Sequence, residues 1–414
     1  MNQIKNNPPP FPPDTVWDVE GGKAAGVYTW FKEISKELGD GWVLSNGRKM
    51  LMLGGYSYLG LNMRPEISQA AMDAIQRFGT GMSGSRFLAG STELHSRLEK
   101  KIAAVHQKED AIVYTSGYLA NVSTIACLVR KRDHILCDKM NHASMVDGAR
   151  YSGAKLIRYP HNNLNRLKKI LAELPDSSRK LVITDAIFSM SGETADIPQI
   201  AALCKKYNAH LMVDECHSMY VLGKTGGGIT EYFNIPADDI SITMATLSKS
   251  IPAAGGYIAS SRKIVNYLRH ESRGFIYSIA LSASMAAAAL AGLKIFETER
   301  EELLGRLNEN TELFKNTLRS SGVRVGHSVT SIVPVFVGNP IKAAVAAKIC
   351  HEQDLYIHAV FPPVVPAGKA ILRASITADH RKEDLIMAAD TIAMIMEKLD
   401  KEDLPDISGY NTKT

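Results

Sequence analysis

The sequence predicts an α/β protein with a large domain around a mostly parallel sheet and a smaller α+β domain behind it. Of the 414 residues, 45% are hydrophobic and 22% are charged, which is typical of a soluble chain with material for two cores. Short β-branched runs alternate with helical patterns from about residue 66 to residue 293, as in a parallel sheet covered on both faces. After residue 297 the pattern changes to a long charged helix and mixed short elements. We therefore expect an N-terminal arm and segment over 1–60, a large domain over 61–297, a small domain over 298–402 and a tail over 403–414.

The N-terminal arm carries five prolines within residues 8–13, which predicts an extended segment. It lacks the basic-then-apolar pattern of a leader peptide, and the five cysteines are odd in number and show no CxxC spacing. These features favour a cytoplasmic protein with reduced thiols and no metal site. The net charge of +5 comes from 48 basic and 43 acidic residues spread along the chain, so no nucleic-acid or membrane arm is expected.

The large domain is expected to contain strands and helices in alternation. The expected strands are Ala111–Tyr114, His134–Cys137, Lys155–Tyr159, Leu181–Ala186, His210–Asp214 and Ile240–Thr246, and the clearest helices are Leu94–His106, Leu164–Leu174 and Ile197–Tyr207. The alanine-rich stretch Ile279–Phe296 includes Lys294 and two serines. This predicts a helix packed inside a domain or at a dimer interface rather than a membrane span.

The small domain is expected to begin with a helix and to end with one. Its elements are helix Thr298–Ser320, strand Ser331–Val337, helix Lys342–Gln353, the proline run Phe361–Pro366, strand Ala370–Thr377 and helix Arg381–Lys398.

Reactive side chains follow two strands of the large domain, where ligands of parallel sheets bind. Strand His210–Asp214 ends in Asp214-Glu215-Cys216-His217. A carboxylate here could pair with a pyridine nitrogen, or it could simply cap a helix. Strand Ile240–Thr246 leads into Thr246-Leu247-Ser248-Lys249-Ser250 and two glycines, which suits a lysine that carries a cofactor beside a bound phosphate. A solvated loop lysine is the alternative.

Three further turns lie at strand ends. Ser116-Gly117-Tyr118 precedes a helix and could bind an anion through backbone N–H groups. His142 could lie flat on an aromatic cofactor, and Ser189 offers a hydroxyl, although both residue types are also common in turns. The order of these groups along the chain is the order found in fold type I pyridoxal-phosphate (PLP) enzymes. Asp214 and Lys249 are 249 − 214 = 35 residues apart, which suits one crossover between adjacent strands.

The sequence resembles the α-oxoamine synthases over roughly residues 40–400. The shared motifs are Tyr56-Ser57-Tyr58-Leu59-Gly60-Leu61, Gly84-Ser85-Arg86, Asn141-His142-Ala143-Ser144, Phe188-Ser189-Met190, Asp214-Glu215-Cys216-His217-Ser218 and Leu372-Arg373-Ala374-Ser375. Tyr56, Ser250 and Met219 resemble the serine palmitoyltransferase branch in particular.

The resemblance implies a role for each motif residue. Lys249 would carry PLP and then remove the α-proton of an amino acid, and Arg373, together with Tyr56, would bind that amino acid. The remaining residues would hold the cofactor: Asp214 at the pyridine nitrogen, His142 stacked on the ring, Ser189 and His217 at the ring oxygen, Ser116, Gly117, Tyr118, Thr246 and Ser248 at the phosphate, and Ser278 at the phosphate of the partner subunit.

The implied reaction is a decarboxylative condensation of an amino acid with an acyl thioester, presented by CoA or by an acyl carrier protein, in a homodimer. Phe361 stands where the serine palmitoyltransferase branch has an arginine, and an uncharged ring there favours alanine or glycine over serine. Ser282-Ala283 also replaces a proline pair of that branch. Transamination and aldol-type cleavage by another fold type I enzyme remain open, because cofactor residues alone do not fix which bond breaks. A non-catalytic subunit is disfavoured by the presence of Lys249.

Overall fold

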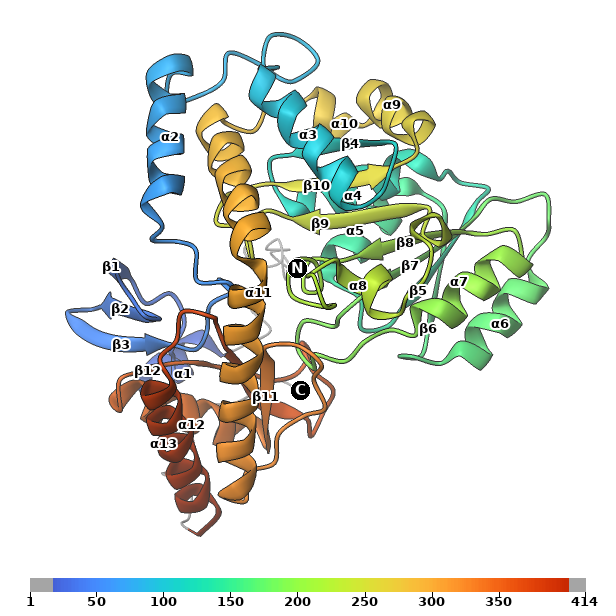
Figure 1. Cartoon of the computed structure of the whole chain (residues 1–414). Helices are drawn as coiled ribbons and strands as arrows, with labels where there is room; N and C mark the ends of the chain where they lie inside the picture. The colour runs from blue at the N-terminus through green and yellow to red at the C-terminus, as the bar shows by residue number, and fades with distance from the viewer. Residues whose placement is uncertain (1–17, 402–414) are drawn as a thin grey trace, which may run out of the picture.

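The structure is a computed structural model, and it describes residues 18–401. The proline-rich run 8–13 and the expected tail 403–414 therefore lie outside the described residues. Figure 1 shows a large sheet flanked by helices above a smaller unit that contains the C-terminal elements.

The large domain contains a seven-stranded sheet in the order β4-β10-β9-β8-β7-β5-β6 (Figure 1). Its strands are β4 Asp110–Tyr114, β5 His134–Asp138, β6 Lys155–Tyr159, β7 Lys180–Asp185, β8 His210–Asp214, β9 Ile242–Thr246 and β10 Gly256–Ser260. The six predicted strands are confirmed to within two residues at each end. The sequence did not indicate β10, a five-residue run directly behind two glycines, which is antiparallel to both of its neighbours while the other pairings are parallel.

Both faces of this sheet are buried, because successive residues of a strand point to opposite sides. On β8, Leu211 belongs to the core on one face and Met212 to the core on the other. The covering helices are α2 Pro65–Phe78, α3 Glu93–Val105, α4 Gly117–Leu128, α5 Ala143–Ser152, α6 Leu164–Glu173, α7 Ile197–Lys206, α8 Gly228–Tyr232, α9 Arg262–Glu271 and α10 Arg273–Ile276. Every strand end that carries a predicted site residue is thus supported from both sides.

The small domain has a three-stranded antiparallel sheet in the order β11-β14-β13. Its elements are β11 Ile332–Gly338, α12 Pro340–Glu352, β12 Leu355–Tyr356, β13 His358–Val360, β14 Ala370–Ser375 and α13 Lys382–Lys401. Leu372 and Ala374 of β14 point into a core that α12 and α13 help to form. Arg373 lies between them in sequence and therefore points to the other face of the sheet.

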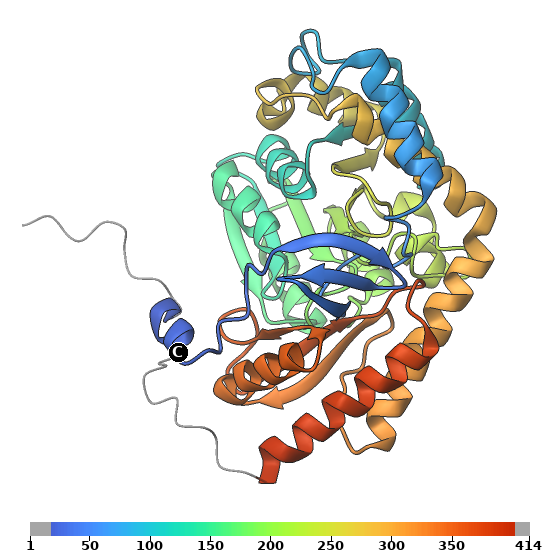
Figure 2. The ribbon, with the colours of Figure 1, turned by 90° about the vertical axis from the view of Figure 1, so that its left-hand side faces the viewer.

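The N-terminal segment contributes structure that the sequence did not predict. After α1 Val19–Ala24, the strands β1 Ile34–Gly39, β2 Trp42–Ser45 and β3 Arg48–Met52 form a meander whose last strand pairs in parallel with β12. Figure 2 shows this meander beside the elements of the small domain. Polar, exposed strands such as Ile34–Gly39 carry little apolar alternation, so their periodicity is weak.

One helix, α11 Ala283–Ser320, runs from the large domain into the small one. The expected boundary at residue 297 falls inside this helix, so the two units share a helix instead of a linker. Its first turns bury Ala286 and Ala289, and Gly292 lies where an added Cβ would come within 3.2 Å of Ile251 and Pro252. The small residues thus let α11 pack closely against the loop that follows Lys249. Within residues 18–401, no helix has the length and apolar character needed to cross a bilayer.

Candidate active site

Asp214 ends β8 with both of its carboxylate oxygens bonded. Its Oδ2 accepts a hydrogen bond from Asn121 Nδ2 at 2.7 Å, and its Oδ1 accepts one from the backbone N–H of Cys216 at 2.9 Å. Asn121 lies on α4 and also donates to Ser144 Oγ at 2.9 Å. The sequence did not single out Asn121, although a buried asparagine within an apolar helix was the available signal. These bonds fix the direction in which the Asp214 carboxylate points.

His142 is the N-cap residue of α5 and follows β5. Its backbone N–H donates to Asp185 Oδ2 at 2.8 Å, and its Nδ1 shares a hydrogen bond with Ser144 Oγ at 2.7 Å. Asp185 ends β7, is paired with Asp214 across the ladder, and was not identified from the sequence. Burial raises the pKa of the Asp185 carboxyl well above its usual value, and the neighbouring Asp214 raises it further.

His217 is buried, and its Nδ1 lies 2.6 Å from the hydroxyl of Tyr58. Burial, followed by the positive charge of Lys249, lowers the pKa of His217 well below its usual value. The ring is therefore neutral at pH 7. In the tautomer whose Nδ1 accepts from Tyr58, the other ring nitrogen carries the proton and can donate a hydrogen bond.

The predicted anion-binding turn lies against the ends of β9 and β10. Ser116 caps α4 by accepting from the backbone N–H of Leu119 at 3.1 Å. A Cβ on Gly256 would come within 2.5 Å of Gly117 Cα, so only glycine allows the start of α4 to approach this closely. Thr246 Oγ1 and Ser248 Oγ are 2.8 Å apart on the same side.

This group of a helix N-terminus and two hydroxyls is suited to a phosphate. The Tyr118 side chain points elsewhere, because its hydroxyl donates to Asp147 Oδ2 at 2.5 Å.

Lys249 lies half-buried in the turn between β9 and β10, and its Nζ is 5.9 Å from the ring centroid of Tyr56. Burial lowers the pKa of Lys249, but the neighbouring Cys216, Asp214 and two tyrosines raise it, and the net shift is upward. The Cζ atom of Arg373 lies 5.2 Å from the same tyrosine ring. The partly exposed ring of Tyr56 thus lies close to both cations of the site.

Arg373 reaches from β14 of the small domain to the large one. Its Nε donates to the backbone carbonyl of Ser189 at 2.7 Å, and its Nη1 donates to Ser375 Oγ at 2.7 Å. Its Nη2 is buried without a hydrogen-bond partner in the described part of the chain. A buried guanidinium nitrogen without an acceptor is costly, so this edge of Arg373 is suited to a ligand carboxylate.

Two sequence-predicted residues are not part of this cluster. Ser278 lies between α10 and α11, and among residues 18–401 no described hydrogen bond joins it to the groups above. Its neighbours Tyr277 and Ile279 are 76% and 56% exposed. Phe361 is buried in the core of the small domain, edge-to-face with Trp30. The expectation that Phe361 favours alanine or glycine over serine is therefore not supported by its position in the core.

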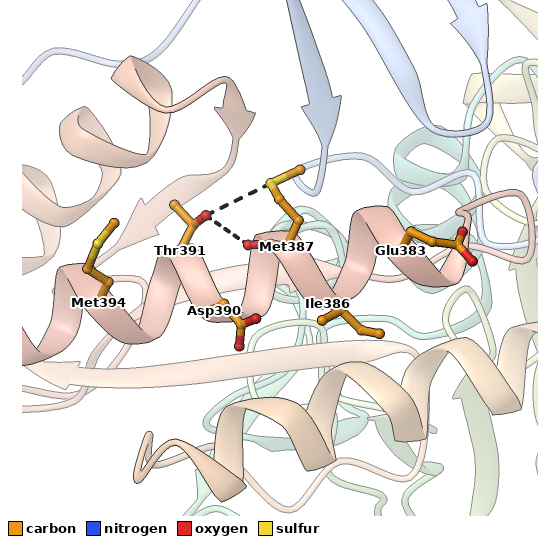
Figure 3. A pocket seen from close by; sticks show the side chains of 6 residues that line it. All are labelled: Glu383, Ile386, Met387, Asp390, Thr391 and Met394. Carbon is orange, nitrogen blue, oxygen red and sulfur yellow. Dashed lines mark hydrogen bonds between the residues drawn. The ribbon is translucent and has the colours of Figure 1, made fainter.

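A surface groove on α13 is separate from the site. Figure 3 shows its lining along one face of that helix, where Thr391 donates to the carbonyl of Met387 at 2.8 Å. Its lining residues are Glu383, Ile386, Met387, Asp390, Thr391 and Met394, and none of them was predicted to bind substrate or cofactor.

The sequence and the structure were compared with those of known proteins. The family model described as aminotransferase class I and II matches residues 48–392. The chain belongs to this family. Among relatives, the serine palmitoyltransferase of Sphingobacterium spiritivorum is 35% identical over 386 residues, which cover 93% of this chain and 96% of that protein. The 8-amino-7-oxononanoate synthase of Geobacter sulfurreducens is 38% identical over 375 residues, which cover 90% and 95%.

A solved structure of serine palmitoyltransferase with PLP superimposes with a TM-score of 0.89 at 28% identity, covering 92% of this chain and 96% of that one. The predicted membership of the α-oxoamine synthases and the fold type I architecture are confirmed. This chain is a PLP-dependent C-acyltransferase. Its donor set fits this cofactor: a fixed carboxylate, a neutral imidazole, a half-buried lysine and a helix N-terminus with two hydroxyls lie at one edge of one sheet.

Proposed function

We propose that this chain condenses a small α-amino acid with an acyl thioester, releases CO2 and yields an α-amino ketone. The observation that carries the proposal is the unpartnered Nη2 of Arg373, which is buried beside the ring of Tyr56 that Lys249 also faces. A guanidinium edge binds the carboxylate of an amino acid, and the lysine amine near the same tyrosine ring can take a proton from its α-carbon.

The cofactor residues are proposed to act as the resemblance implies. Bound PLP supplies an electron sink for the negative charge that develops at the α-carbon. Asp214 would hold the pyridine nitrogen protonated, and the two N–H groups that donate to Asp214 keep its carboxylate oriented. The remaining contacts would be His142 on the ring face, His217 and Ser189 at the ring oxygen, and Ser116, Gly117, Thr246 and Ser248 at the phosphate. Tyr118 would contribute there through its backbone N–H, since its hydroxyl bonds to Asp147.

Separate residues of the chain would transfer the proton, orient the substrate and hydrogen-bond to the cofactor. Lys249 would accept the α-proton at Nζ and return a proton after CO2 has left. Arg373 would orient the amino acid by its carboxylate, and Tyr56 would shield the reacting carbon from water with its ring. The neutral His217, with its proton on the nitrogen away from Tyr58, would donate a hydrogen bond to the cofactor's ring oxygen.

A homodimer is part of the proposal. Exposed apolar side chains surround Ser278 and occur on the loop before α3, where Phe87 and Leu88 are 53% and 79% exposed. Large exposed apolar groups of this kind are typical of a surface that a partner covers. Ser278 would then reach the phosphate of the neighbouring subunit. We also expect a cytoplasmic enzyme that takes its acyl group from CoA or from an acyl carrier protein, with the domains bounded near residues 60, 297 and 402.

The reaction is tested by incubating the PLP-loaded protein with carboxyl-labelled glycine, alanine or serine and a series of acyl-CoA thioesters. Thioester-dependent release of labelled CO2 is expected with at least one of the three. Transfer of the amino group to an α-keto acid without CO2 release would instead identify an aminotransferase. The shared site is tested by mixing Lys249→Ala and Ser278→Trp chains. Recovered activity is expected in hybrid dimers, and proven subunit exchange without recovery would contradict a shared site.

A further inference from the structure

Glu215 lies between two site residues in sequence, yet its side chain points away from the site. It is fully buried, and its backbone N–H donates to the carbonyl of Met244 on β9 at 2.7 Å. Its Oε2 accepts hydrogen bonds from Ser218 Oγ at 2.9 Å and from the backbone N–H of Ile229 at 2.7 Å. One carboxyl group therefore ties the end of β8 to the start of α8, fourteen residues further along.

The glycine-rich loop before α8 is built around this carboxyl group. Gly228 has φ of +76°, and a Cβ there would come within 2.2 Å of Glu215 Oε2. No side chain could replace this glycine without moving the carboxyl group. A second glutamate, Glu231, accepts from the backbone N–H groups of Thr225 and Gly227 at 2.8–3.1 Å and holds the loop internally. Glu231 makes no described contact with residues 214–219, so the two glutamates have separable roles.

The segment that Glu215 closes carries two groups of the site. His217 lies on it, and so does Met219, whose carbonyl accepts a hydrogen bond from Ser250 Oγ at 3.3 Å. Ser250 directly follows Lys249. The position of segment 215–229 therefore determines where the His217 imidazole lies, which contacts Tyr58, and where the turn that carries Lys249 lies.

We propose that Glu215 is a positioning residue of the active site, which fixes the spacing between His217 and the Lys249 turn by clamping segment 215–229 onto the end of β8. This positioning role adds to the proposed function. It rests on that function only for the identity of the reaction. Burial raises the pKa of Glu215 to about 7, and the hydrogen bonds from Ile229 and Ser218 oppose this shift. Both hydrogen bonds go to Oε2, while Oε1 is buried without a hydrogen-bond partner in the described part of the chain. The clamp therefore needs one acceptor oxygen and not a charge, so an amide should replace the carboxyl group.

The test compares Glu215→Ala with Glu215→Gln and uses Glu231→Ala as the matched control. In cofactor-free protein, trypsin cleavage after the exposed Lys224 should accelerate at least about tenfold in Glu215→Ala and in Glu231→Ala, but not in Glu215→Gln. After PLP is added, Glu215→Ala alone should shift the long-wavelength absorbance of the cofactor and the pH at which it titrates. Its kcat should fall at least about tenfold, whereas Glu215→Gln should stay within about threefold of the parent.

Identical spectra and pH titration for Glu215→Ala and the parent would overturn the proposal, and so would a Glu215→Gln protein as impaired as Glu215→Ala. If Glu215→Ala does not fold, Ser218→Ala removes one of the two bonds and should shift the same spectral titration in the same direction; an unshifted titration there would also overturn it. A parent protein that binds PLP at Lys249 but condenses no thioester would refute the proposed reaction. The spectral and proteolytic comparison would still decide the role of Glu215.

Discussion

In the large domain, adjacent strands of one sheet bring Asp185, Asp214 and Lys249 to a common edge, whereas the small domain sends a single guanidinium from the middle of β14. The two carboxylates are held by hydrogen bonds from neighbouring groups: Asp185 accepts from His142, and Asp214 accepts from Asn121 and Cys216. Arg373 keeps one nitrogen without a partner in the described chain. The cofactor side is therefore formed before ligands bind, while the substrate side is completed by the substrate, and mutations on the two sides should differ in kind.

The largest effect is expected at Lys249, on the cofactor side. Lys249→Ala should lower kcat by on the order of a thousandfold or more, because it removes the amine proposed to move the α-proton. The same variant should lose the borohydride-reducible link to PLP, measured by mass spectrometry of tryptic peptides. A lysine still labelled in the variant would place the link elsewhere.

Arg373 tests the substrate side. Removing the charged anchor of a desolvated carboxylate costs about 3–5 kcal/mol, so Arg373→Ala should weaken amino-acid binding roughly a hundredfold to a thousandfold. PLP affinity should change little, because Arg373 bonds to the main chain of Ser189 and to Ser375 and to no proposed phosphate ligand. Spectral titration of the loaded protein with amino acids measures both quantities, and Ser375→Ala, which keeps the cation, is the control. Normal amino-acid affinity in Arg373→Ala would contradict the assignment of Arg373 as the substrate anchor.

The buried Glu215, on the cofactor side, should make the stability of the protein depend on pH. Its pKa is raised from the ordinary value of 4.5 to about 7, so the folded protein holds a proton that the unfolded chain loses between these pH values. The free energy of unfolding should therefore fall as pH rises from about 4.5 to about 7, by up to about 3 kcal/mol from this group. Lys108, Asp214, Tyr220 and Tyr257 are the titratable groups around it. Urea unfolding of Glu215→Gln should lack this component, and equal pH dependence in both proteins would contradict the assignment.

The smallest effect is expected at Tyr58, which lies on the N-terminal segment between the two sides. Tyr58→Phe removes the 2.6 Å contact with His217 Nδ1 and should cost about 1 kcal/mol, or about fivefold in kcat. Because nothing then requires Nδ1 to accept, the pH profile of kcat should change while the amino-acid KM stays constant. A change in KM alone would place Tyr58 on the substrate side.

Strand-end motifs could be predicted because short β-branched runs precede them. The six parallel strands, and the positions of Asp214, His142 and Lys249 at their ends, follow from local pattern. Asn121, Asp185 and Tyr58 could not be predicted in the same way, because their roles depend on which strands and helices become neighbours. The antiparallel β10 and the pairing of β3 with β12 were also missed, since a five-residue strand and a long-range pairing leave little periodicity.

Phe361 illustrates the limit of reading a residue by its place in a motif. The resemblance to the serine palmitoyltransferase branch placed it at the amino-acid pocket, but the apolar ring packs against Trp30 in the core of the small domain. Burying an aromatic ring is worth several kcal/mol, which outweighs any gain from facing a polar ligand. Because Phe361 lies in the core, it gives no reason to prefer one amino acid, and glycine, alanine and serine are equal candidates for the titration.

The shared helix α11 has a mechanical consequence. Its 38 residues make a rod about 57 Å long, and a rod that is anchored in both domains transmits force instead of absorbing it. The small domain therefore cannot swing freely at residue 297; it must tilt together with the rod, whose first turns press on the loop behind Lys249. Heating should accordingly melt both domains in a single calorimetric transition, because neither can unravel without fraying the helix on which the other packs.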